Sequence, residues 1–143
     1  MTAQYRILVV DDNEPTRLLI ARILTQELPA TVTLAGGAEE AERQMQQARF
    51  DVILLDLLMP HASGFDVLKW MREGNSPNRN TPVLVVSVLG DQESIERCRR
   101  LGASVHIVKP ILRDTLAAAV REHLPSPGQR TADNPDRAGP GTN

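Results

Sequence analysis

Short apolar runs alternate with helical segments along most of this chain. Five runs favour β-strands: residues 6–10, 31–34, 51–55, 83–86 and 105–108. The first, third and fourth runs are almost continuously apolar, as strands covered on both faces must be. Apolar residues at helical spacing predict five helices: from about Pro15 to Leu28, and over 37–48, 64–73, 91–101 and 111–124. This alternation predicts an α/β fold with a parallel sheet, right-handed crossovers and helices on both faces.

Length and composition indicate one folded domain followed by a tail. A chain of 143 residues can bury about two-thirds of its unfolded surface, and its single cysteine, Cys98, permits no intrachain disulfide. Residues 125–143 are rich in Pro and Gly and carry almost no large apolar side chain. Such a segment cannot offset its ordering entropy by burial. We therefore expect a folded domain over 1–124 and a disordered tail over 125–143.

The charge of the chain argues against a nucleic-acid partner. The formal net charge is -2, so no general attraction to nucleic acid and no direct DNA binding is expected. The N-terminal apolar run over 5–10 is too short for a signal peptide or a membrane span. We expect a cytoplasmic protein without membrane insertion.

Acidic side chains and one lysine follow the predicted strands. Asp11 and Asp12 follow the first strand, Asp56 the third and Lys109 the fifth, while Ser87 follows the fourth. Ligands of open α/β sheets bind at the carboxyl ends of the strands, so these side chains are expected to meet. Neighbouring carboxylates repel one another unless a cation lies among them, and Mg²⁺ prefers oxygen ligands. The pattern predicts a Mg²⁺ site.

A carboxylate in such a pocket can act as a nucleophile toward phosphorus. Asp56 is the best candidate because it ends the third strand, and its attack on a phosphoryl donor would give an acyl phosphate. Lys109 would pair with the phosphoryl oxygens, and the hydroxyl of Ser87 could donate to one of them. For Asp11 and Asp12 alone, capping of the next helix is an equally good interpretation.

Four motifs in this order resemble the receiver domain of two-component response regulators, of the stand-alone chemotaxis type. They are VVDDN at 9–13, LLDLLMPHASG at 54–64, VS at 86–87 and VKP at 108–110. The resemblance spans about residues 5–124. It implies a doubly wound (βα)5 fold, similar to flavodoxin, with five parallel strands in the order 2-1-3-4-5.

The resemblance also implies the role of each acidic residue. Asp56 would be the phosphoacceptor. Asp12 and Asp56 would bind Mg²⁺ directly together with the backbone carbonyl of Leu58, while Asp11 would assist through water.

Other residues would sense the phosphoryl group. Ser87 and Lys109 would contact it, and Lys109-Pro110 would be a cis peptide. Ser87 and His106 would form the switch, although the family commonly has Tyr or Phe where this chain has His106. A histidine adds a titratable group to the signalling surface.

Apolar bulk around the acceptor predicts a long-lived phosphate. Leu58 lies two residues past Asp56, and Val88 and Leu89 follow Ser87. These side chains should hinder an attacking water, so we hypothesise slow self-hydrolysis.

The implied function is a phosphorylation-controlled binding module. A sensor histidine kinase would phosphorylate Asp56, and the face made by the fourth helix, fifth strand and fifth helix would change its affinity for a downstream protein. Such a monomer or weak dimer is a phosphoacceptor signalling protein rather than an enzyme, although it assists its own phosphorylation and slow dephosphorylation. Two alternatives within the family stay open: a phosphorelay intermediate that passes phosphate to a histidine phosphotransfer protein, and a receiver that acts without phosphorylation.

Two other classes of protein fit the sequence less well. A phosphatase of the haloacid-dehalogenase type needs a second acid two residues beyond its nucleophile, where this chain has Leu58. A flavodoxin-like cofactor protein needs a phosphate-cradling loop after the first strand, where Asp11 and Asp12 would repel a flavin phosphate.

The remaining reactive side chains have structural interpretations. Cys98 shares a helical face with Ile95 and Leu101 and is expected to be buried. His61 and His123 are expected at the surface, and Trp70 in packing or in a surface patch. Five arginines could form a basic docking face or simply be solvated: Arg97, Arg99, Arg100, Arg113 and Arg121.

Overall fold

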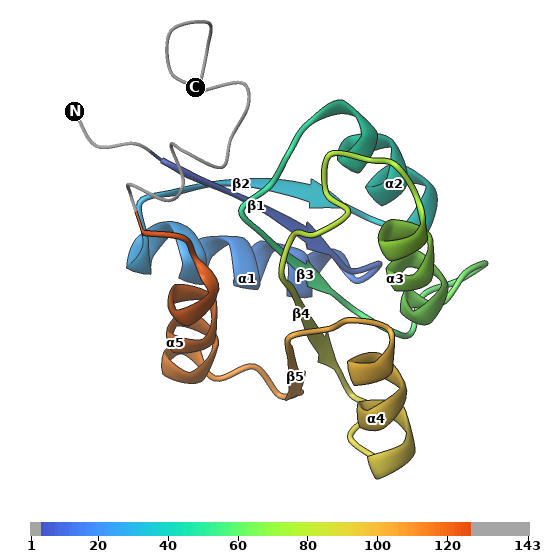
Figure 1. Cartoon of the computed structure of the whole chain (residues 1–143). Helices are drawn as coiled ribbons and strands as arrows, with labels where there is room; N and C mark the ends of the chain where they lie inside the picture. Colours follow the sequence, from blue (N-terminus) through green and yellow to red (C-terminus); the bar gives the residue numbers. More distant parts are fainter. Residues whose placement is uncertain (1–3, 127–143) are drawn as a thin grey trace, which may run out of the picture.

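A five-stranded parallel sheet forms the centre of the computed structural model, which describes residues 4–126. The strands lie in the order β2-β1-β3-β4-β5 (Figure 1). Their bounds are β1 (Tyr5–Val10), β2 (Ala30–Ala35), β3 (Val52–Leu55), β4 (Val83–Ser87) and β5 (Val105–Val108). The predicted doubly wound α/β fold and its strand order are confirmed.

Helices cover both faces of the sheet (Figure 1). One face carries α1 (Glu14–Glu27) and α5 (Arg113–His123). The other face carries α2 (Ala38–Gln47), α3 (Gly64–Glu73) and α4 (Gln92–Arg100). Every predicted strand and helix exists, with bounds within two residues of those predicted from apolar spacing.

The strand pleat divides the core into two clusters. Along β1, Leu8 and Val10 pack with the residues of α2, α3 and α4, whereas Ile7 and Val9 pack with those of α1 and α5. All four side chains are at most 1% exposed. Full burial of such a side chain contributes roughly 1.5–3 kcal/mol, so the two clusters hold the helices on their respective faces.

The helices begin at polar caps. The side chain of Asn13 accepts a hydrogen bond from the backbone of Thr16 at 3.0 Å and caps α1. Asp91 caps α4 in the same way. Because Asn13 supplies the cap of α1, Asp11 and Asp12 are left for another role.

A fully buried asparagine connects the loop between α3 and β4 to the end of α2. Asn78 donates from Nδ2 to the carbonyl oxygens of Met45 and Ala48 at 2.8 and 2.6 Å. Its Oδ1 accepts from the backbone of Phe50 at 2.7 Å and from the hydroxyl of Thr81 at 3.0 Å. All the hydrogen-bonding capacity of this buried amide is therefore used.

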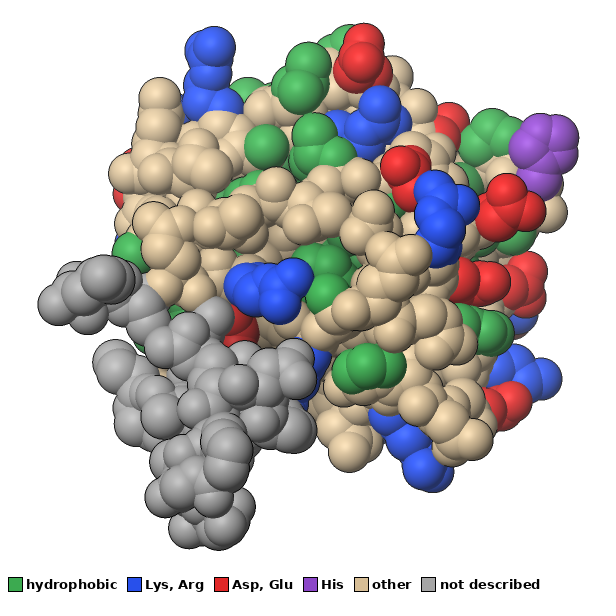
Figure 2. All heavy atoms as spheres, turned by 90° about the horizontal axis from the view of Figure 1, so that it is seen from above, with side chains coloured by type: hydrophobic (Ala, Val, Ile, Leu, Met, Phe, Trp, Pro, Cys, Tyr) green, Lys and Arg blue, Asp and Glu red, His purple; other side chains and the backbone are tan. Residues whose placement is uncertain are grey.

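The surface carries both signs of charge. On the face shown in Figure 2, basic and acidic side chains are interspersed, with separate hydrophobic side chains between them. None of the helices within residues 4–126 is long and apolar enough to cross a membrane.

The predicted tail falls almost wholly outside the described residues. Residues 127–143 are not among them, so the prediction of disorder there stays a prediction. At the boundary, the hydroxyl of Tyr5 donates to the carbonyl oxygen of Pro125 at 3.0 Å. This bond ties the chain after α5 to the first strand.

Candidate functional site

The predicted site residues lie where parallel strands end at one edge of the sheet. Asp11, Asp56 and Lys109 continue the backbone ladder beyond β1, β3 and β5. The N–H of Asp56 donates to the carbonyl of Val10 at 3.0 Å, and that of Lys109 to the carbonyl of Ser87 at 2.8 Å. Sheet geometry therefore fixes the backbone from which these side chains depart.

Three carboxylates meet at this edge. One oxygen from each of Asp11, Asp12 and Asp56 can be chosen so that all three lie within 4.8 Å of one another. Asp11 is 1% exposed and Asp56 5%, whereas Asp12 is exposed. Buried carboxylates this close require a counter-charge.

Lys109 supplies that counter-charge. Its Nζ lies 2.9 Å from Oδ2 of Asp11 and 3.5 Å from Oδ2 of Asp56. Burial disfavours the charged amine, but the hydrogen bond to Asp11 and the charges of Asp56 and Asp11 outweigh burial and raise the pKa of Lys109. The lysine is therefore held in its charged form.

The buried carboxylate of Asp56 is poorly stabilised in its charged form. Burial, reinforced by the charge of Asp11, raises the pKa of Asp56 above its ordinary value, although Lys109 and neighbouring backbone N–H groups act in the opposite direction. Its Oδ1 accepts a long bond of 3.4 Å from the N–H of Leu58. A carboxylate in this state gains from an added cation.

Gly64 packs directly on the backbone of this acid. A Cβ at position 64 would collide with the backbone carbonyl oxygen of Asp56 and lie 2.8 Å from Cα of Leu57. The N–H of Gly64 also donates to the carbonyl of Leu57 at 2.9 Å. Only glycine fits this close approach, which holds the loop from β3 to α3 against the backbone of Asp56.

Ser87 and His106 are connected through one residue of the loop between β4 and α4. The N–H of Leu89 donates to Oγ of Ser87 at 3.2 Å, and its carbonyl oxygen lies 2.6 Å from Nε2 of His106. Because a carbonyl only accepts, this contact requires a proton on Nε2. The other ring nitrogen of His106, Nδ1, is buried and has no hydrogen-bond partner among the described residues. The predicted switch residues are thus joined through the Leu89 backbone.

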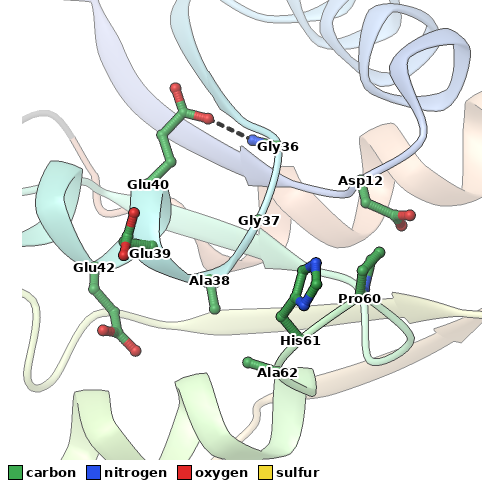
Figure 3. Close-up of a pocket in the computed structure, with 10 residues that line it drawn as sticks. All are labelled: Asp12, Gly36, Gly37, Ala38, Glu39, Glu40, Glu42, Pro60, His61 and Ala62. Carbon is green, nitrogen blue, oxygen red and sulfur yellow. Dashed lines mark hydrogen bonds between the residues drawn. The ribbon is translucent and has the colours of Figure 1, made fainter.

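Apolar side chains lie beside the acidic residues. Leu58 is 50% exposed and Val88 59%, while Leu89 is half-buried. A groove of about 820 Å³ also borders Asp12 and is lined from the loop after β2, the start of α2 and the loop after β3 (Figure 3). The acidic site therefore borders an open groove on the side of Asp12.

The other reactive side chains are not part of this cluster. Cys98 is buried between α4 and the sheet, as expected, and burial raises the pKa of its thiol. His61 is exposed, with a φ of 71°, while His123 is half-buried and its Nδ1 lies 2.8 Å from the carbonyl of Ala119. Trp70 packs at the edge of the core. Lys109-Pro110 is a cis peptide, as predicted.

Sequence reasoning missed three participants at this site. It assigned no role to Arg17, whose Nη1 donates to the backbone carbonyl of Asp11 at 2.7 Å. It also missed the contact of Gly64 with Asp56 and the use of the Leu89 carbonyl by His106. The glycine could have been found from its place at the end of the LLDLLMPHASG motif, but backbone acceptors carry no sequence signal.

Comparison with known proteins agrees with this geometry. The response regulator receiver domain family matches residues 7–121. The chain is 30% identical over 120 residues to sporulation initiation phosphotransferase F of Bacillus subtilis, covering 84% of this chain and 94% of that protein. It is 36% identical over 117 residues to the sensory/regulatory protein RpfC of Xanthomonas campestris, covering 78% of this chain but spanning only 16% of RpfC.

Solved structures agree with the sequence relatives. The chemotaxis response regulator CheY4 of Vibrio cholerae superposes with a TM-score of 0.78 at 30% identity, over 85% of this chain and all of CheY4. The fold, the motifs and the sequence relatives therefore lead to one conclusion: this chain belongs to the response regulator receiver domain family of two-component signalling, whose members are phosphoacceptors.

Proposed function

We propose that this chain is a single-domain response regulator. Asp56 accepts a phosphoryl group from a sensor histidine kinase, and phosphorylation changes the binding of a partner protein at the face made by α4, β5 and α5. The observation that carries the proposal is the position of Lys109, whose Nζ lies within 3.5 Å of the carboxylates of both Asp11 and Asp56. One cation beside three acids suits a site that receives a divalent metal together with an anionic group.

The acidic cluster fits Mg²⁺. Receiver domains typically bind this ion at their aspartates, and here three carboxylate oxygens lie within 4.8 Å of one another. Asp12 and Asp56, with the backbone carbonyl of Leu58, would hold the ion directly, and Asp11 would act through water. When bound, Mg²⁺ neutralises the acids and withdraws charge from the phosphoryl oxygens.

Phosphoryl transfer to Asp56 is a substitution at phosphorus. A carboxylate oxygen of Asp56 forms the new P–O bond while the bond from phosphorus to the donor's imidazole nitrogen breaks, and its electron pair stays with the imidazole. Lys109, which is paired with Asp11 before the reaction, turns toward the phosphoryl oxygens. The hydroxyl of Ser87 donates a hydrogen bond to one of them.

Movement of Ser87 provides a route to the surface. Its Oγ accepts from the N–H of Leu89, and the same residue's carbonyl holds His106. When Ser87 turns toward the phosphoryl group, the bond to Leu89 lengthens and the position of His106 on β5 changes. The partner then meets an altered face of α4, β5 and α5.

Incubation with acetyl phosphate and Mg²⁺, followed by intact mass measurement, tests the proposal. The native chain should gain the mass of one phosphoryl group, whereas Asp56→Asn and the native chain in EDTA should not. Asp114→Asn, which removes an exposed acid at the start of α5, is the matched control and should behave as native. If neither acetyl phosphate nor a histidine kinase modifies the native chain, a phosphorylation-independent binding module replaces this proposal.

A phosphorelay intermediate is the second candidate. Similarity to sporulation initiation phosphotransferase F over 94% of that protein favours it. The test is to mix the phosphorylated chain with a histidine phosphotransfer protein and follow the phosphoryl group. Rapid transfer supports the relay, and a stable acyl phosphate supports the output role.

The proposal includes no DNA and no membrane partner. The net charge of -2 supplies no general attraction to nucleic acid. We propose the cytoplasm as the place of action, because that is where a sensor kinase would present its phosphohistidine.

A further inference from the structure

We propose that Arg17 is a positioning residue for the acidic cluster of Asp11, Asp12 and Asp56. By holding the backbone of these acids, Arg17 sets the affinity of the cluster for Mg²⁺. The inference rests on the proposed Mg²⁺ site and adds to it a residue outside the motifs. Arg17 lies in α1 and is half-buried. Its Nη1 donates to the backbone carbonyl of Asp11 at 2.7 Å. The guanidinium thus returns from the helix to the loop that carries the acids.

The other hydrogen-bonding groups of Asp11 are already engaged. Its N–H donates to the carbonyl of Ala35 at 3.1 Å. Its Oδ1 accepts from the N–H of Asn13 at 2.9 Å, and its Oδ2 accepts from Nζ of Lys109 at the same distance. Among the described residues, only Arg17 donates a hydrogen bond to the carbonyl of Asp11.

That carbonyl belongs to the peptide group linking Asp11 to Asp12. Because a peptide group is planar, holding its oxygen also sets the direction in which the backbone enters Asp12. Asp12 is exposed and lies in the loop between β1 and α1, so little packing restrains it. Arg17 therefore acts on the cluster chiefly by placing Asp12 relative to the two buried acids.

Glycine at position 36 makes room for the guanidinium. A Cβ there would lie 3.2 Å from Nη1 of Arg17 and 3.7 Å from Oε1 of Glu40. The same carboxylate accepts a hydrogen bond from the N–H of Gly36 at 2.7 Å, as the dashed line in Figure 3 shows. At neighbouring Gly37, by contrast, a Cβ would meet nothing within 4 Å.

A positioning role and a purely electrostatic role make opposite predictions. A positive guanidinium near the acids repels Mg²⁺, so if only its charge mattered, removing it would tighten Mg²⁺ binding. If the guanidinium positions the Asp11 carbonyl, removing it loosens the ligand set and weakens Mg²⁺ binding. Affinity for Mg²⁺ therefore separates the two roles by its sign.

The pair Gly36→Ala and Gly37→Ala tests the inference without changing any charge. Neither glycine has a positive φ, so the backbone accepts alanine at both positions. We expect Arg17→Met, which removes the hydrogen bond, to raise the Mg²⁺ dissociation constant about tenfold by calorimetry, as loss of an outer hydrogen bond at a metal site typically does. Gly36→Ala, whose methyl group pushes on the end of the guanidinium, should change affinity in the same direction by a smaller factor. Gly37→Ala should stay within about twofold of native.

A second measurement separates positioning from general damage. In acetyl phosphate reactions at increasing Mg²⁺, Gly36→Ala and Arg17→Met should need more Mg²⁺ for half-maximal rate yet approach the native rate at saturation. Tighter or unchanged Mg²⁺ binding by Arg17→Met would overturn the inference while leaving the proposed function standing. A native chain that binds no Mg²⁺ would instead overturn the proposed function, and this inference with it.

Discussion

Nζ of Lys109 and Oδ2 of Asp11 form an ion pair of 2.9 Å between side chains that are 18% and 2% exposed. The two residues are 98 positions apart in the chain. Since Lys109 also lies 3.5 Å from Asp56, one amine compensates two buried carboxylates.

Loss of this amine should destabilise the metal-free protein. Removing one partner of a buried pair leaves uncompensated charge, so we expect Lys109→Met to lower the free energy of unfolding by about 3 kcal/mol in EDTA. Mg²⁺ should recover part of the loss, because it takes over the compensation. Denaturant unfolding with and without Mg²⁺ measures both effects. The control is Lys69→Met, which changes the other, exposed lysine; an equal loss there would refute the assignment.

Replacing the acceptor carboxylate should stabilise the metal-free fold at neutral pH. The pKa of Asp56 is raised by burial and by Asp11, so its folded state releases the proton less readily than its unfolded state. Ionised Asp56 therefore costs stability once the pH is above that raised pKa. Asp56→Asn should raise the Tm by a few degrees at pH 7 in EDTA, where about 1 kcal/mol corresponds to roughly 2–5 °C.

This advantage should depend on pH in a defined direction. As the pH falls through the raised pKa, native Asp56 takes up its proton, and the advantage of Asp56→Asn should shrink until it is lost below the ordinary value of 3.8. Thermal scans from pH 7 downward provide the measurement, with exposed Glu122→Gln as control. An advantage that grew on acidification would contradict the argument.

The bonds through Leu89 should couple Ser87 to His106. Ser87→Ala removes the acceptor of the Leu89 N–H, so the carbonyl of the same residue should shift and the ring resonances of His106 should change in ¹⁵N NMR spectra. Thr25→Ala on α1 is the control, because its hydroxyl is exposed and donates within its own helix to the carbonyl of Ala21. Unchanged His106 signals in Ser87→Ala would show that the two residues are independent.

Apolar side chains near Asp56 should protect the acyl phosphate. We expect Leu58→Gln with Leu89→Gln to speed the loss of phosphate several-fold, because polar groups can orient an attacking water. The decay of the phosphorylated mass over time measures it. Leu18→Gln, which alters an equally exposed leucine on α1, should leave the decay unchanged. Equal decay rates in the native and doubly substituted chains would count against slow hydrolysis as a property of these residues.

A methyl group at position 64 should disturb the acceptor loop. Gly64→Ala would force a Cβ against the backbone of Asp56, and overpacking of this kind costs typically about 1–3 kcal/mol. Both stability and the rate of phosphorylation should fall. Gly37→Ala adds the same methyl group into open space, so it should lose only the N-cap preference of glycine at the start of α2 and leave the rate of phosphorylation unchanged.

Local pattern was enough to predict the α/β class and the position of the acids, whereas the strand order was predicted from the resemblance to receiver domains. Each strand and helix leaves its own apolar period in the chain, and residues that end parallel strands must lie at one edge of the sheet. For that reason the grouping of Asp11, Asp12 and Asp56 could be expected before any coordinates. The core position of Cys98 followed in the same way from its helical face.

Contacts between distant segments were decided only by the tertiary structure. Asn78 is of a residue type common in turns, yet it is fully buried and its amide joins the loop after α3 to α2. Arg17 has no sequence feature that distinguishes it from a solvated helical arginine. It nevertheless donates to the Asp11 carbonyl, because Gly36 leaves space for its guanidinium. Hydrogen bonds to backbone carbonyls depend on loop paths and strand register rather than on residue type. Apolar periodicity therefore determined the framework, whereas the partners of its buried polar groups were set when the distant loops closed on one another.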